Sequence, residues 1–118
     1  MIARLLPALL WSSILCAVAI GQELPLERIA FGSCVRQDRP QPIWQAVSAV
    51  RPELFLMIGD NIYGDSEDVE ILQAKYRMLR DDLGFSNLRA SCPILAVWDD
   101  HDYGVNDGGR EHPQREAS

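Results

Sequence analysis

The sequence predicts an α/β domain with parallel strands, in the order β-α-β-α-β. Three short apolar runs have the length and composition of buried strands. The segments between them carry apolar residues at helical spacing and have short connections. Right-handed crossovers would then place consecutive strands parallel in one sheet.

The first strand is expected at Ile29 to Phe31, which leads into Gly32, Ser33 and Cys34. A polar stretch marked by prolines follows. The next apolar residues fall at helical spacing, and Pro42 suits the first turn of that helix: Ile43, Trp44, Val47 and Val50. We expect this short helix to end near Arg51.

The second strand is expected at Leu54 to Ile58, an apolar run typical of a central parallel strand. It delivers Asp60 to its carboxyl end. Ser66 is expected to cap the next helix, and Gly84 to end it. The apolar stripe of this helix comprises Val69, Leu72, Tyr76, Leu79 and Leu83.

The third strand is expected at Ile94 to Trp98, after a connector that follows Gly84. The polar residues from Asp99 to Gly104 should then form a loop. The tail, residues 109–118, lacks apolar periodicity, and we expect its His112 to be exposed to solvent.

The composition indicates a folded globular chain, with 47% hydrophobic and 24% charged residues among 118. The formal net charge of −6 disfavours nucleic acid or an anionic membrane as a partner. An acidic protein that handles phosphate needs a local source of positive charge. A bound metal ion or a helix N-terminus would supply it.

Residues 1–21 have the pattern of a cleaved secretory signal, with Arg4 before an apolar stretch and small residues near Gly21. This stretch is short for a stable membrane anchor. We therefore expect a secreted or periplasmic protein whose domain occupies residues 22–108. After cleavage Cys34 and Cys92 remain, either as a disulfide or in separate roles.

Chemically versatile side chains follow all three predicted strands. Cys34 follows the first strand, Asp60 the second, and the run from Asp99 to Asp102 the third. Ligands of open α/β sheets bind beyond the carboxyl ends of the strands. Thiolate, carboxylate and imidazole groups at one such edge predict a metal site suited to metal-assisted hydrolysis.

These segments resemble the metallophosphatase core of alkaline phosphatase D-like proteins. The similar motifs are Phe31 to Cys34, Gly59 to Asp65, Trp98 to Gly104, and Asn106-Asp107. The resemblance implies half of a calcineurin-like α/β sandwich. It also implies a dinuclear centre that hydrolyses phosphomonoesters or phosphodiesters, small-molecule substrates, by a metal-bound hydroxide.

The same resemblance assigns roles to individual residues. It implies metal ligation by Cys34, Asp60, Tyr63 and Asp100, with Asp60 bridging two ions. It makes His101 the proton donor or transition-state stabiliser, oriented by Asp102. Iron with calcium is the expected pair of metals, whereas the ligand set alone also permits zinc or manganese.

Related enzymes complete their centres with histidines from later strands, which this chain does not contain. Two interpretations therefore stay open. The chain is either an exported phosphoesterase, whole or an N-terminal piece, or a non-catalytic remnant that at most binds a cation.

Overall fold

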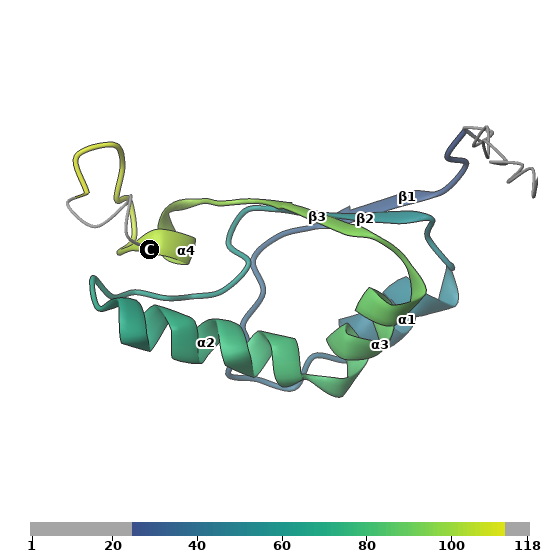
Figure 1. The fold of residues 1–118 in the computed structure, drawn as a ribbon, viewed down its shortest axis with the longest axis horizontal. Coiled ribbons are helices and arrows are strands. Elements are labelled where there is room, and N and C mark those ends of the chain that lie inside the picture. Colours follow the sequence, from purple (N-terminus) through teal and green to yellow (C-terminus); the bar gives the residue numbers. More distant parts are fainter. Residues whose placement is uncertain (1–24, 113–118) are drawn as a thin grey trace, which may run out of the picture.

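The computed structural model describes residues 25–112, which form an α/β domain around a three-stranded parallel sheet of order β1-β2-β3 (Figure 1). The strands are β1 (Ile29–Gly32), β2 (Leu54–Ile58) and β3 (Ile94–Val97). Phe31, Leu56 and Leu95 are aligned across the sheet. The three predicted strands and their parallel direction are confirmed, although β3 ends one residue earlier than expected.

In the described part of the chain the sheet is accompanied by four helices: α1 (Ile43–Ala49), α2 (Val69–Asp81), α3 (Leu83–Ser91) and α4 (Asp100–Tyr103). Figure 1 shows α1, α2 and α3 on one side of the sheet, while α4 lies beyond the end of β3. The short helix α4 replaces the loop expected after the third strand. Asp99 explains this difference, because its side chain caps α4 in a capping box with Asp102.

The prediction for the second helix was wrong at both ends. Asp68, rather than Ser66, is the N-cap of α2 and accepts a hydrogen bond from the Glu70 amide. The helix ends at Asp81. The next residue, Asp82, has extended backbone and caps α3 by accepting from the Phe85 amide at 2.9 Å. The expected connector is therefore helix α3.

Gly84 contributes to packing instead of ending a helix. A Cβ atom at this position would lie 2.8 Å from Cβ of Trp44, so glycine lets α3 approach α1 closely. Leu83, assigned to the apolar stripe, is 81% exposed because it lies beyond the break at Asp82.

The core lies between the sheet and the three helices. Trp44 of α1 is at its centre, with ring centroids 5.9 Å from Phe55 and 4.9 Å from Phe85. Other buried members are Met57, Ile62, Leu72, Leu79, Leu88 and Cys92. Cys92 is buried in this core, whereas Cys34 is exposed, and both thiols are free.

The described part of the tail packs against the domain through His112. His112 is only 6% exposed, so the prediction of a solvent-exposed side chain was wrong. Its ring lies 5.8 Å from the Tyr103 ring and against Gly104, where a Cβ atom would come within 2.7 Å of it. The absence of a side chain at Gly104 creates the space that His112 fills.

The predicted signal, residues 1–21, lies outside the described residues. Within residues 25–112 no helix is long and apolar enough to cross a membrane.

Candidate metal centre

The candidate site lies at the carboxyl end of the sheet, where the loops after β1 and β2 are joined by backbone hydrogen bonds. The Cys34 amide donates to the Gly59 carbonyl at 3.4 Å, and the Val35 amide donates to the Asp60 carbonyl at 2.8 Å. These bonds place the first-strand loop directly beside Asp60.

The loops after β2 and β3 also approach closely, and Gly59 permits it. Gly59 has φ of 103°, and a Cβ atom there would lie 2.9 Å from Cβ of Asp99. Asp60 follows with φ of 49°, a left-handed conformation that costs energy in a non-glycine residue. This strained turn brings the Asp60 carboxylate toward the β3 loop.

Three side chains from these two loops converge on one point. Ligand atoms of Asp60, Asp100 and His101 all lie within 4.8 Å of one another. In addition, Oδ1 of Asp60 is buried and has no hydrogen-bond partner among residues 25–112. A buried carboxylate oxygen without a donor is costly, and a cation would satisfy it. The donor set therefore fits a metal ion.

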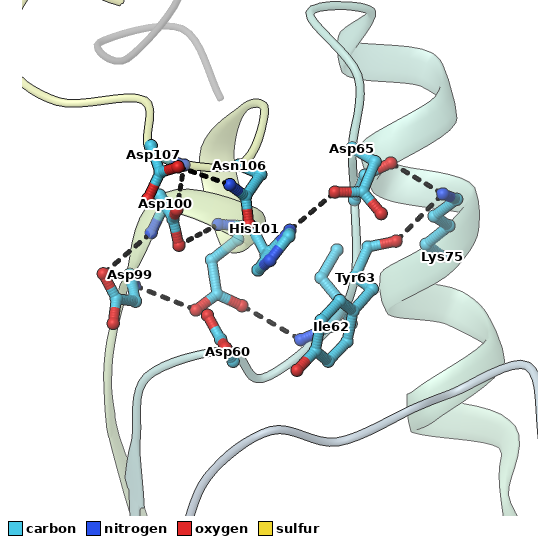
Figure 2. Close-up of polar contacts among 12 residues, drawn as sticks. Asp60, Ile62, Tyr63, Asp65, Lys75, Asp99, Asp100, His101, Asn106 and Asp107 are labelled. Atoms are coloured by element: carbon cyan, nitrogen blue, oxygen red, sulfur yellow. Dashed lines mark hydrogen bonds and ion pairs between the residues drawn. The ribbon is translucent and has the colours of Figure 1, made fainter.

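His101 is held by a carboxylate that the sequence analysis did not assign. Its Nδ1 lies 2.6 Å from Oδ1 of Asp65, as Figure 2 shows. The Tyr63 ring packs against the imidazole, with ring centroids 4.4 Å apart. Because Nδ1 faces Asp65, Nε2 is the nitrogen that can serve a metal or a substrate.

Asp100 is oriented by local amides. Its Oδ1 accepts from the His101 amide at 2.9 Å, and its Oδ2 accepts from the Asp107 amide. Asp107, which has φ of 61°, belongs to the turn after α4. The segment 105–108 thus folds back on the site and fixes the Asp100 carboxylate.

Asp102 is buried, at 2% exposure, and forms a clamp between two loops. Its Oδ1 accepts from the Ile62 amide and the Tyr76 hydroxyl, each at 3.0 Å. Its Oδ2 accepts from the Asp99 amide and the Asn61 side chain, at 3.0 and 3.2 Å. Asp102 was expected to orient the His101 ring. In the structure Asp65 pairs with the ring, while Asp102 connects the loops.

Cys34 and Tyr63 lie beside Asp60. The Cys34 Sγ atom is 3.5 Å from Oδ2 of Asp60. Burial raises the pKa of Tyr63 to about 12, and its neighbours Cys34 and Asp60 act in the same direction. Both residues border the group formed by Asp60, Asp100 and His101. The Arg36 guanidinium stacks 4.9 Å from the Tyr63 ring centroid and adds a positive charge nearby.

Residues from outside the motifs hold the Tyr63 loop in place. Gln37 forms a reciprocal pair with the Tyr63 backbone, donating to its carbonyl at 3.2 Å and accepting from its amide at 2.9 Å. Lys75 donates to the carbonyls of Tyr63 and Gly64 at 2.9 and 2.6 Å. Of the residues that support the site without having been predicted to do so, Asp65 lies inside the motif from Gly59 to Asp65. Gln37 and Lys75 lie outside every motif, so nothing in the sequence pointed to them.

The structure thus places all six predicted site residues at one end of the sheet, where Asp102 is buried. In comparisons with known proteins, no family model matches, and neither a curated protein nor a solved structure matches significantly.

Proposed function

We propose that this chain carries the site of a metal-dependent phosphoesterase that hydrolyses phosphomonoesters or phosphodiesters. The observation that supports it is the convergence of Asp60, Asp100 and His101, together with the buried, unpartnered oxygen of Asp60. A cation held there supplies Lewis-acid activation of water and neutralises charge on phosphate oxygens. The following roles concern the protein's own side chains.

Asp60 and Asp100 would hold the cation, since their carboxylates come from different loops and face a common point. The amides of His101 and Asp107 donate to the Asp100 carboxylate and fix its orientation. Asp60 is fixed through its backbone, because its carbonyl accepts from Val35. Cys34 and Tyr63 are positioned to add a thiolate and a phenolate, a combination that suits ferric iron.

His101 would assist departure of the leaving group. In its protonated form, Nε2 donates a proton to the ester oxygen as the phosphorus–oxygen bond breaks, which avoids expulsion of an alkoxide. Asp65 stabilises the positive imidazolium from the Nδ1 side. A positioned acid near the phosphate can do this, and His101 lies within the same 4.8 Å group.

The motifs that resemble alkaline phosphatase D-like proteins support the finer parts of the proposal. These are a calcineurin-like fold, iron with calcium as the metals, and export through residues 1–21. Calcium would suit a site rich in carboxylates, and this end of the sheet also carries Asp99 and Asp107.

A second candidate function is cation binding without hydrolysis. The group of Asp60, Asp100 and His101 favours it, because His101 is as well placed to be a third metal ligand as to protonate a leaving group. In that case no side chain of the group would be left to protonate a leaving group. Metal would bind, but phosphoesters would not be cleaved.

The test is metal loading followed by a hydrolysis assay. The purified chain is stripped with chelator and reloaded with iron, zinc or manganese, with and without calcium. Metal content and hydrolysis of p-nitrophenyl phosphate and bis(p-nitrophenyl) phosphate are then measured. Asp60→Asn should lose the metal and the activity, whereas Asp81→Asn, exposed at the end of α2, should retain both.

Each outcome distinguishes the two candidates. Stoichiometric metal with hydrolysis supports the phosphoesterase, and stoichiometric metal without hydrolysis supports cation binding alone. A folded protein that takes up no metal would refute both.

A further inference from the structure

The Asp100 carboxylate, a candidate metal ligand, is held by a loop that ends in a buried histidine. The Asp107 amide of this loop donates to Oδ2 of Asp100, as Figure 2 shows. Asp107 lies in an exposed turn and has a left-handed backbone, with φ of 61°. This conformation costs energy in a non-glycine residue, so contacts elsewhere in the loop must keep the turn in place.

Two contacts close the loop of residues 105–112 onto helix α4. The Tyr103 hydroxyl donates to the Gly108 carbonyl at 2.6 Å. The chain then makes a second turn, in which the His112 amide donates to the Gly109 carbonyl at 2.9 Å. This turn brings the His112 side chain back to the end of α4, where the centroid of its ring lies 5.8 Å from that of Tyr103.

The His112 ring occupies a space that a side chain at residue 104 would fill, called the socket below. A Cβ atom at Gly104 would lie 2.7 Å from both Cε1 and Nε2 of the ring. The ring is buried, and Nε2 has no hydrogen-bond partner among residues 25–112. No hydrogen bond offsets the cost of burying this nitrogen, so the contribution of the ring at the socket is packing.

We propose that His112 is a positioning residue for the metal centre, because its ring anchors the loop that supplies the Asp107 amide to Asp100. The inference rests on the proposed function, in which Asp100 holds the cation. Gly104 joins the socket to the centre, since its amide donates to the Asp100 carbonyl at 2.9 Å. A loop anchored at both ends holds the carboxylate in place before a metal ion binds, which lowers the cost of ordering it on binding.

Amide hydrogen exchange, followed by NMR on the isotope-labelled, metal-free chain, tests the anchoring role. His112→Ala removes the ring and should abolish the protection of the Asp107 amide. The Val35 amide, which donates to the Asp60 carbonyl at 2.8 Å in the loop after β1, should keep its protection. General loosening of the fold would speed exchange at both amides, so the comparison isolates loss of the local anchor.

Zinc affinity, measured by competition with a chelating dye, tests the consequence for the centre. Partners of metal ligands typically contribute 10- to 100-fold to affinity. Because the His101 amide still supports Asp100, His112→Ala should lower zinc affinity by about tenfold, the smaller end of that range. Gly104→Ala should have a similar effect, since its methyl group displaces the ring. The double variant should bind no more weakly than either single variant, because both act through the same socket.

Gly32→Ala is the matched control for the glycine substitution. A Cβ atom there would meet nothing closer than 3.6 Å, so this variant should bind zinc as the wild type does. Circular dichroism verifies that each variant is folded, and Gly104→Ala provides a second way to empty the socket if His112→Ala is not.

Three results would overturn the proposal. The first is an Asp107 amide that is unprotected in the wild type or stays protected in folded His112→Ala. The second is zinc affinity that His112→Ala leaves unchanged, and the third is losses of affinity that add in the double variant. A wild type that binds no metal would instead count against the proposed function, because exchange in the metal-free chain reports on the loop in either case.

Discussion

Oδ1 of Asp65 lies 2.6 Å from Nδ1 of His101, although the two residues belong to loops after different strands. The contact turns the imidazole so that Nε2 can serve the candidate centre. Asp65 has φ of 47°, so a strained backbone is maintained at the residue that positions the histidine.

Asp65→Asn should weaken the centre without unfolding the protein. An amide cannot stabilise a positive imidazolium, and such outer partners typically contribute 10- to 100-fold to metal affinity or activity. We expect a loss of roughly that size in metal affinity, measured by competition with a chelating dye. Asp81→Asn is the control, because Asp81 is exposed and pairs with Arg80. Unchanged affinity in Asp65→Asn would contradict a positioning role.

Asp102→Ala should be strongly destabilising. Four donors would lose their acceptor in a buried location, and loss of such a charged partner costs about 3–5 kcal/mol. Urea denaturation followed by circular dichroism measures the free energy of unfolding. Asp81→Ala on the surface should change it by less than about 0.5 kcal/mol. Equal effects of the two substitutions would argue against the clamp.

Tyr76→Phe should remove one bond of that clamp. The hydroxyl donates to a carboxylate, so its loss should cost about 1.5–3 kcal/mol of unfolding free energy. In a double-mutant cycle with Asp102→Ala, which removes the acceptor, most of this cost should disappear, because the two groups interact directly. Additive effects would show that the hydrogen bond contributes little.

Gly59→Ala should disturb the approach of the β2 and β3 loops. Its φ of 103° is unfavourable for alanine, and the new methyl group would meet Cβ of Asp99 at 2.9 Å. We expect a loss of stability above about 1 kcal/mol and loss of metal binding. Gly32→Ala, whose nearest neighbour would be 3.6 Å away, is the matched control and should be tolerated. Equal metal binding in the two variants would refute the requirement for close loop approach.

The phenol of Tyr63 should lose its proton only at high pH in the metal-free protein. Its pKa is about 12, against 10.0 for an unperturbed tyrosine, so folding favours the protonated form. The resulting stabilisation is present below pH 10 and is lost as the pH rises from 10 to 12. Ultraviolet absorbance of the phenolate should show this step in wild type and lack it in Tyr63→Phe. If Tyr63 binds ferric iron, the phenolate should form at neutral pH and give a visible charge-transfer band.

The strands and the types of site residue were predictable from the sequence. Leu54–Ile58 was predicted without error, because a buried central strand requires a continuous apolar run, and such a run is visible in the sequence. The presence of Cys34, Asp60 and Asp100 at one edge also followed, since parallel strands end at the same side of the sheet.

Partners of individual side chains were not predictable. The sequence places several acids near His101, but only the strained turns at Asp60 and Asp65 decide which carboxylate reaches the ring. Helix α2 stops before Asp82, and not at Gly84 as expected. Gly84 lies instead in α3, where the lack of a side chain allows close packing against Trp44. His112 is buried because Gly104 leaves it room.

The sequence by itself therefore determined the three strands, the first two helices and the chemistry available at one edge of the sheet. The tertiary structure decided that Asp65 faces His101, that Asp102 joins two loops, and that the helices of residues 25–112 lie on one face of the sheet. The physical reason is that apolar periodicity is a local property of the chain. Hydrogen-bond partners and covered faces depend instead on contacts between segments far apart in sequence.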